Sequence, residues 1–570
     1  MADRIDLLSP PGTPESTTGY AKVLSDQAAE DFGIDVLAQA MTVRGISSRQ
    51  IESILRTLVV DPEVISYRQA VLFDLAASPA LCEALAALIP KIQELTEFTR
   101  SATDAESQVL QAIWRLGELE LYVECVEDLS DALEEHGGHI QAHALVNLRD
   151  HLVATRAEDL FKELKRELPQ LRAGIKKKQS LTLGINLDNR LRPEAATLLS
   201  VNEYRFTENT LLGGFFDALR KRHRHTTETT LFRMPRPEEI GLPPGSKIPL
   251  DPLFRDIETL LRSVARPIVR NLERYLRVTT GFLASLRPQL AFFLGAAKLM
   301  ERLSAAGLPV CKPEVEPAAH RTMQAAGFYN LQLALRMLNE HENTALDGSS
   351  GGPGLILNDV DFGESGRIFV LTGPNQGGKT TFTQGIGLLH VVTQAGLFAP
   401  AQAAKVSPVD QVCTHFPAEE RGQLETGRLG EEAGRLKEIF HQITALSLVL
   451  LNESLSSTSP AEAGYIAEDI LKAMRRLGNR AVFATHLHDV AERCSTINSQ
   501  VDGESRVASL VACVDESAGA ADDDGSAERT YRIVPAPPVG QSFARDIARM
   551  HGISLEQITD TLSRRGVLEN

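Results

Sequence analysis

The sequence contains little cysteine and no long apolar run. Its 570 residues include six cysteines, at positions 82, 125, 311, 413, 494 and 513, and none belongs to a Cys-x-x-Cys pair. This scatter argues against a zinc site or a disulfide framework and favours a reducing, cytoplasmic location. No stretch approaches about 18 uninterrupted apolar residues, and the N-terminus lacks the basic start and apolar core of a secretory signal. We therefore expect no segment that spans a membrane and no membrane partner.

An excess of positive charge is also missing, because the formal net charge is −16. Proteins that bind nucleic acid over their whole surface are usually basic, so the overall charge argues against that mode of binding. Two local basic runs remain, at residues 162–178 and 220–225. Each run is either part of a nucleic-acid path or an ordinary solvated helix face, and the sequence leaves both interpretations open.

The patterns of apolar residues change along the chain, which is too long for a single hydrophobic core. Apolar residues recur at helical spacing over 33–172 and again over 252–307. Between these regions, residues 179–206 alternate polar and apolar side chains and predict a small β hairpin. Prolines mark a connecting segment at 309–317. From about residue 346, short apolar runs alternate with helical patterns, which predicts a mainly parallel sheet with helices on both faces.

The most informative segment reads Gly-Pro-Asn-Gln-Gly-Gly-Lys-Thr-Thr. It follows a predicted buried strand at 367–372 and precedes apolar residues at helical spacing, a context typical of a phosphate-binding loop. A glycine-rich turn that happens to carry a lysine is the alternative, and the flanking strand and helix disfavour it. The residues that we expect to hold ATP are Gly373, Pro374, Asn375, Gln376, Gly377, Gly378, Lys379, Thr380 and Thr381.

Each residue type in this loop has a physical role. Glycines let successive backbone N–H groups converge on phosphate oxygens, and the helix N-terminus adds its dipole. Lys379 is expected to reach the β- and γ-phosphates, and the Thr380 hydroxyl is expected to bind Mg²⁺. The sequence therefore predicts a nucleotide-binding protein that uses ATP and Mg²⁺.

Two further elements of an ATPase follow in the expected order. The apolar run 447–451 ends in Asn452 and Glu453. ATPases of this kind usually carry aspartate at the first position, so Asn452 keeps an oxygen for the Mg²⁺ shell but loses the negative charge. Glu453 is the candidate general base; an Asn-Glu pair that merely caps a strand is the alternative. Another strand, 481–485, precedes His486, which we expect to sense the γ-phosphate, although an isolated histidine there is more often structural.

These motifs resemble those of the MutS family of DNA mismatch-repair ATPases. The resemblance covers essentially all of 355–555 and is weaker in the helical region before it. The segments that carry it are 373–381, Gly396–Ala401, Ser447–Leu450, Ser457–Ser459, Ala484–His486, and Gln541–Ala548 followed by His551–Ser554.

The resemblance implies a multi-domain fold: an all-α core and lever region with a small β insertion, then an α/β P-loop ATPase domain of the ABC type. The implied boundaries are a helical core segment at 1–100, levers at 101–345 with a clamp-like insertion near 179–235, and the ATPase domain at 346–570. It also implies a homodimer with composite ATP sites that encircles duplex or branched DNA and changes state with ATP, in repair or recombination.

The sequence departs from the family pattern in several places. We expect no N-terminal mismatch-reading domain, and Phe206-Thr-Glu208 matches its letters only by coincidence, because it lies mid-chain. The segment that enters the partner's site usually offers Ser-Thr-Phe, whereas 426–432 reads Thr-Gly-Arg-Leu-Gly-Glu-Glu. We therefore hypothesise that Arg428 contacts nucleotide across the dimer. We predict no nuclease activity.

Two other classes of protein remain as alternatives. The acidic charge and the missing mismatch domain favour a dimeric ATP-binding interaction protein with little DNA affinity. Another ABC-type ATPase is a weaker alternative, because no Leu-Ser-Gly-Gly-Gln-like signature precedes the second nucleotide strand.

Overall fold

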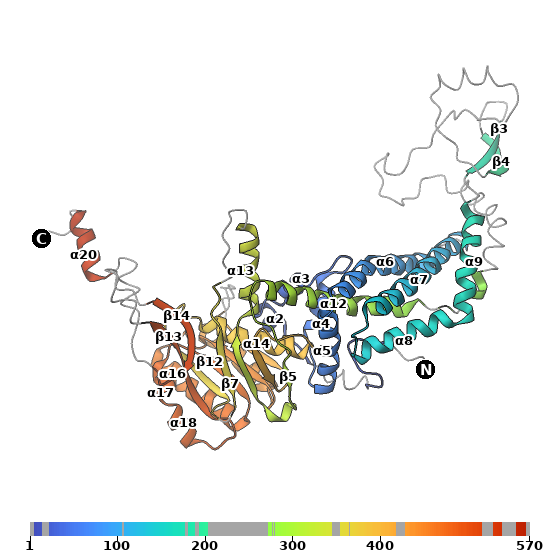
Figure 1. The fold of residues 1–570 in the computed structure, drawn as a ribbon. Helices are drawn as coiled ribbons and strands as arrows, with labels where there is room; N and C mark the ends of the chain where they lie inside the picture. Colours follow the sequence, from blue (N-terminus) through green and yellow to red (C-terminus); the bar gives the residue numbers. More distant parts are fainter. Residues whose placement is uncertain are drawn as a thin grey trace. The chain divides into compact units, whose positions relative to one another are not determined.

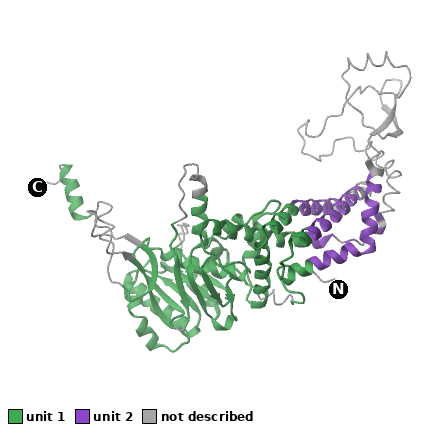
Figure 2. Cartoon of the chain, in the orientation of Figure 1, with its two compact units in different colours: residues 1–89, 132–148, 286–570 green, residues 90–131, 149–285 purple. Residues whose placement is uncertain are grey.

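The computed structural model divides into two compact units, which are described separately (Figure 2). Unit 1 comprises 1–89, 132–148 and 286–570, and unit 2 comprises 90–131 and 149–285. The structure describes residues 5–13, 22–104, 108–176, 180–187, 193–202, 272–275, 278, 280–344, 354–363, 365–417, 428–515, 528–538 and 554–565. The expectations placed on the basic run 220–225, on Phe206–Glu208 and on Gln541–Ala548 lie outside the described residues.

Helices dominate the first part of the chain, as the apolar spacing predicts (Figure 1). They are α2 (Asp26–Asp31), α3 (Ile34–Ala40), α4 (Ser48–Leu55), α5 (Pro62–Ala76), α6 (Pro79–Asp104), α7 (Gln108–His136), α8 (His143–Ala157), α9 (Asp159–Lys176) and α12 (Gly281–Ala305). The start of α5 shows why these segments are helical. Pro62 occupies its first turn, and the Asp61 carboxylate accepts a hydrogen bond from the Glu63 N–H at 2.9 Å.

Among the described helices, none is by itself long and apolar enough to cross a membrane. Within the described ranges, only α5 taken together with Pro79–Ser101 of α6 meets the length and composition requirement, and this pair is bent by 103° at its break.

The α/β part of unit 1 contains a six-stranded sheet in the order β10-β11-β12-β8-β13-β14. Its first five strands are parallel, and β14 pairs antiparallel with β13. The strands are β8 (Ile368–Thr372), β10 (Val412–His415), β11 (Leu448–Asn452), β12 (Arg480–Ala484), β13 (Val507–Asp515) and β14 (Glu528–Pro535). The helices of this part are α13 (Leu331–Thr344), α14 (Lys379–Gln394), α15 (Arg428–Gln442), α16 (Pro460–Leu477), α17 (His488–Glu492), α18 (Cys494–Gln500) and α20 (Leu555–Arg564).

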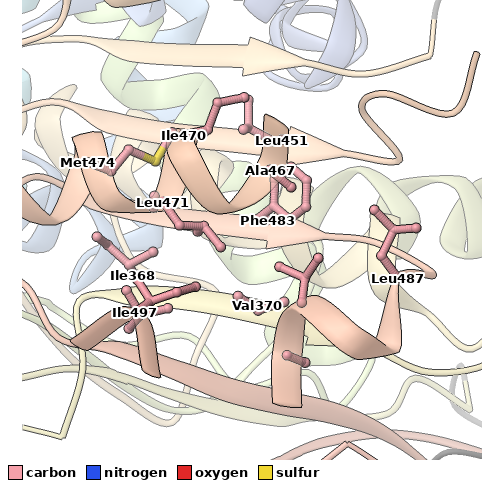
Figure 3. Packing of buried hydrophobic residues seen from close by; sticks show 14 of the residues in the cluster. Ile368, Val370, Leu451, Ala467, Ile470, Leu471, Met474, Phe483, Leu487 and Ile497 are labelled. Atoms are coloured by element: carbon pink, nitrogen blue, oxygen red, sulfur yellow. The ribbon is translucent and has the colours of Figure 1, made fainter. Parts of the chain in front are cut away.

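One face of this sheet packs on α16, α17 and α18 through a buried apolar cluster (Figure 3). Strand residues such as Val370 and Phe483 meet Leu471 of α16 and Ile497 of α18 there, and all four are fully buried. Because every residue of β8, β11 and β12 is buried, these strands form a rigid base for the loops that follow them.

The N-terminal helices are part of the same unit and pack on α14. The Gln384 side chain of α14 donates to the carbonyl of Asp31 at 2.9 Å, and Gln394 donates to the carbonyl of Val59 at 3.0 Å. A Cβ atom at Gly387 would lie 2.2 Å from the Phe32 ring, so glycine is required at this close approach. These contacts fix the position of α14 within unit 1.

A second, four-stranded sheet was not predicted. It has the order β5-β9-β6-β7, with β5 (Glu314–Val315), β9 (Ala403–Val406), β6 (Met323–Phe328) and β7 (Asn358–Phe362). The segment 309–317, interpreted from its prolines as a connection, therefore includes a strand. The short β5 is held by pairing with β9, about 90 positions further along the chain, which local sequence patterns do not show.

Unit 2 contains a buried carboxylate and a hairpin. Glu118 accepts hydrogen bonds from Thr280 at 2.6 Å, from Thr99 at 2.9 Å and from Arg115 at 2.6 Å, which joins its helices. The hairpin pairs β3 (Ser180–Leu187) antiparallel with β4 (Pro193–Asn202), as the alternation predicts. The combination of helices and an α/β part with mixed sheets agrees with the multi-domain fold expected.

Candidate functional site

The glycine-rich loop, residues 373–378, joins the end of β8 to the first turn of α14. Its backbone lies in the left-handed region at Gly373 (φ 141°), Gln376 (φ 60°) and Gly378 (φ 87°). A Cβ atom at Gly373 would also lie 2.7 Å from that of Ala512. Glycine is thus required by both conformation and space, and the loop wraps the N-terminus of a 16-residue helix, a place suited to an anion.

Lys379 closes the loop on itself. Its side chain is only 4% exposed, and its ammonium group donates to the carbonyls of Gly373 and Pro374, each at 3.0 Å. Burial lowers the pKa of Lys379, and the nearby negative charge of Glu453 offsets only part of this effect. The ammonium group thus lies at the loop, within electrostatic reach of a carboxylate.

Thr380 connects the loop to the neighbouring strand end. Its hydroxyl donates to Oδ1 of Asn452, the last residue of β11, at 3.2 Å, and the Asn452 side chain is buried. Hydroxyl and carboxamide oxygens are both ligands that Mg²⁺ accepts, so this pair fits a divalent cation beside the loop. The two residues that the sequence assigns to the metal are therefore brought together.

Glu453 follows Asn452 in the left-handed conformation, with φ 50°. Its N–H donates to the carbonyl of Ala484 on β12 at 2.8 Å. This turn directs the residue to a cavity of about 420 Å³ that the glycine-rich loop also lines. Glu453, Lys379 and Thr380 thus share one cavity.

The other wall of the cavity comes from segments that the sequence analysis did not assign to the site. They are the end of β6 with the start of α13, the segment before β7 with the first residue of that strand, and β14. Their lining residues are Phe328, Tyr329, Asn330, Leu333, Met337, Gly354, Leu355, Ile356, Asn358 and Tyr531. A mostly apolar wall of this kind suits a flat, partly aromatic group next to the polar loop.

Asn330 ties this wall to the loop helix. Its side-chain amide donates to the carbonyl of Thr381 at 2.9 Å, and its Oδ1 accepts from the N–H of Leu333 at 3.0 Å. One buried carboxamide therefore caps α13 and holds it against the first turn of α14.

His486 lies after the end of β12 and is exposed, and within the described part of the chain it does not line the cavity. His488, two positions further on, is half-buried. Burial and the positive charges at Lys379 and His486 lower its pKa. The sequence analysis named only the first histidine, although both belong to the segment Thr-His-Leu-His that follows the strand.

Arg428 is the first residue of α15, and its side chain lies outside what the structure describes. The helix itself packs through Leu429 and Ile439 against the buried apolar cluster on the main sheet, as does Ile443 just after it. The preceding residues, 418–427, are also outside the described part, so the role assigned to Arg428 remains a prediction.

Comparisons with known families match two regions of the chain. The MutS2 N-terminal domain matches residues 60–306, and MutS domain V matches residues 369–553. The second region contains the glycine-rich loop, Asn452, Glu453 and His486, and so includes every residue that the sequence assigns to the site.

Individual relatives carry the same names. The chain is 30% identical over 249 residues to the DNA mismatch repair protein MutS of Granulibacter bethesdensis, which covers 41% of this chain and 25% of the relative. It is 28% identical over 291 residues to the endonuclease MutS2 of Thermomicrobium roseum, covering 50% and 34% respectively. With the MutS2 endonuclease of Thermus thermophilus it shares 29% over 197 residues, covering 35% and 24%.

The chain therefore spans about a quarter to a third of the length of these curated relatives. The two domain matches, at residues 60–306 and 369–553, together with relatives of both names, establish its family. The chain belongs to the MutS family.

Proposed function

We propose that this chain is an ATP-dependent DNA-binding protein of the MutS type, which hydrolyses ATP at the cavity beside the glycine-rich loop. The observation that supports this most is the convergence of Lys379, Thr380, Asn452 and Glu453 beyond the carboxyl ends of the parallel strands β8 and β11. The loop backbone and Lys379 would hold the phosphates, and the apolar wall near Phe328 and Tyr531 would hold the base.

Hydrolysis requires a base, a metal and an in-line water. Glu453 accepts a proton from water as the water oxygen bonds to the γ-phosphorus and the bond to the ADP oxygen breaks, which gives ADP and inorganic phosphate. Mg²⁺, held near Thr380 and Asn452, would neutralise charge on the phosphate oxygens. His486 is proposed to sense the γ-phosphate, and Arg428 to act on the nucleotide of a partner subunit in a homodimer.

The rate of ATP hydrolysis, measured with and without DNA, tests this function. Homoduplex, mismatched and four-way-junction DNA should be compared, and stimulation by one form would identify the preferred structure. No hydrolysis by folded protein under any of these conditions would contradict the proposal. For the composite site, Arg428→Ala should lower turnover; unchanged hydrolysis and dimerisation would exclude Arg428 from that site.

A dimeric ATP-binding interaction protein with little DNA affinity is the second candidate, and the described basic run of unit 2 favours it. On α9, Lys165 pairs with Glu127, Arg172 Nη1 lies 3.2 Å from a carboxylate oxygen of Glu120, and Lys162 donates to the carbonyl of Ala157. Two of these cations, Lys165 and Arg172, are thus already paired with carboxylates, in a chain of net charge −16.

A salt titration of DNA affinity separates the two candidates. Contacts with phosphate groups give a steep loss of affinity between low and physiological salt, because counterions are released on binding. Absence of binding at low salt would favour the interaction protein.

A further inference from the structure

We propose that His415 and Ser454 form a buried positioning pair that holds Glu453 in the conformation needed to activate water. This inference rests on the ATPase activity proposed above and assigns a role in it to a strand, β10, that contributes no residue to the cavity.

The backbone around Glu453 needs external support. Glu453 has φ 50° and Leu455 has φ 67°, so two non-glycine residues on either side of Ser454 lie in the left-handed region. Such conformations are unfavourable for residues that carry a Cβ atom, and they persist only where the surroundings enforce them. The turn that carries the base is therefore held by its contacts rather than by local preference.

The side chain of Ser454 supplies such a contact. Its Oγ lies 2.7 Å from Nδ1 of His415 and 3.4 Å from the carbonyl oxygen of His415. Both side chains are almost completely buried, His415 at 2% and Ser454 at 3% exposure. A hydrogen bond in such a place is directional and shielded from water, so it fixes the residue that follows Glu453.

The topology explains why His415 can do this. Strands β10 and β11 are parallel neighbours, and His415, the last residue of β10, is opposite Leu451 near the end of β11. The turn after β11 is thus held on one side by β10, through Ser454, and on the other by β12, through the bond from Glu453 to Ala484.

The environment of His415 keeps this pair neutral. Burial, together with the charge of Arg435, lowers the pKa of His415 to about 4. Among the described residues, Nε2 of His415 has no hydrogen-bond partner. The imidazole ring is therefore bonded to Ser454 through Nδ1 alone. Neither His415 nor Ser454 lines the cavity, and we therefore assign both a positioning role.

The loop after Glu453 is also attached to α15. Ser457 Oγ donates to the carboxylate of Glu432 at 2.8 Å, and Arg435 of the same helix donates to the carbonyl of Phe416, the residue after His415, at 3.5 Å. The pair thus lies where the base, strand β10 and α15 meet.

Steady-state ATP hydrolysis and equilibrium nucleotide binding of four variants test this inference. His415→Leu and Ser454→Ala remove the hydrogen bond and should lower kcat by about tenfold or more while leaving the Kd for ATP within about twofold, because only the base is displaced. His415→Asn keeps a hydrogen-bonding group near the position of Nδ1 and should recover most of the lost kcat. His441→Leu, at an exposed histidine of α15, is the matched control and should behave as the wild type.

The outcomes are distinguishable. Unchanged kcat in Ser454→Ala, or equal losses in His415→Leu and His415→Asn, would overturn the positioning role while leaving the ATPase proposal intact. Parallel losses of kcat, ATP affinity and Tm would also overturn it, since they indicate a purely structural pair. A wild type that binds no ATP would contradict the proposed function itself, and the positioning role with it.

Discussion

The hydroxyl of Thr380 lies 3.2 Å from Oδ1 of Asn452 and joins the first turn of the loop helix to the end of a neighbouring strand. An aspartate is usual at the second of these positions in ATPases of this kind. The Asn452 side chain is only 3% exposed. A carboxylate at this position would therefore lie in a region of low dielectric constant, where its negative charge would interact strongly with a bound cation.

Asn452→Asp should therefore strengthen Mg²⁺ binding. In the absence of metal, a buried carboxylate at position 452 repels the neighbouring carboxylate of Glu453. When Mg²⁺ is present, the added negative charge attracts it. We expect the Mg²⁺ concentration that half-saturates ATP hydrolysis to fall by about tenfold, which corresponds to about 1.4 kcal/mol. Asn339→Asp, on the exposed side of α13, is the control. Equal Mg²⁺ dependence of wild type and Asn452→Asp would remove Asn452 from the metal site.

Glu453→Gln should abolish turnover and spare binding. The amide is nearly isosteric with the carboxylate but accepts no proton, and general bases typically contribute about 10²–10⁴-fold to the rate. Single-turnover hydrolysis and ATP binding measured on the same preparation separate the two effects. Glu301→Gln on α12 should leave both unchanged. Retained turnover in Glu453→Gln would assign the base to another residue.

Gly373→Ala should damage the loop, because φ 141° is unfavourable for alanine and the new methyl group would press on Ala512. A loss of about 1–3 kcal/mol of stability and of most nucleotide binding is expected. Gly434→Ala offers a contrasting substitution, since this glycine lies inside α15 with open space around it. Chemical unfolding should show the Gly434→Ala variant to be more stable than the wild type by up to about 1 kcal/mol. If both substitutions changed the free energy of unfolding in the same way, backbone strain in the loop would be contradicted.

His415 should make stability depend on pH in a defined window. Its folded-state pKa of about 4 is below the ordinary value of 6.5, so the unfolded chain binds a proton that the folded chain does not. The contribution is fully present above pH 6.5 and is lost as the pH falls towards 4, with a total of about 3 kcal/mol.

Unfolding free energies of wild type and His415→Asn between pH 4 and 7 test this directly. The wild type should lose more stability than the variant as the pH falls, so the difference between their free energies of unfolding becomes smaller. Burial also lowers the pKa of His390. Because both proteins contain this histidine, its contribution to the pH dependence of stability cancels in the comparison. Parallel pH curves would show that His415 is not held neutral.

The sequence predicted the central strands of the main sheet closely because they are largely apolar, whereas β10 (Val412–His415), which reads Val-Cys-Thr-His, was not predicted. The run 447–452 corresponds to β11 at Leu448–Asn452, and 481–485 to β12 at Arg480–Ala484. The second sheet gave no comparable signal. Strand β6 reads Met-Gln-Ala-Ala-Gly-Phe, rich in residues with low β-propensity, and its pairing depends on segments far away in the chain.

The candidate site divides in the same way. The loop, Asn452 and Glu453 follow strands in a recognisable order, so motif and context located them. Tyr531 and Ile356 reach the cavity only because separate segments fold onto the loop helix. The contact between His415 and Ser454 joins residues 39 positions apart and is likewise a product of strand order rather than of local pattern.

Calorimetric titration of ATP with Mg²⁺ into the wild type and Lys379→Ala tests the central claim most directly. Lys379 holds the loop closed through two carbonyls and places the positive charge beside it. The account predicts one ATP bound per chain in the wild type and at least about a hundredfold weaker binding in the variant, the loss expected when a hydrogen-bonded charge is removed. Folded wild type that binds no ATP, or a variant that binds it equally well, would contradict the account.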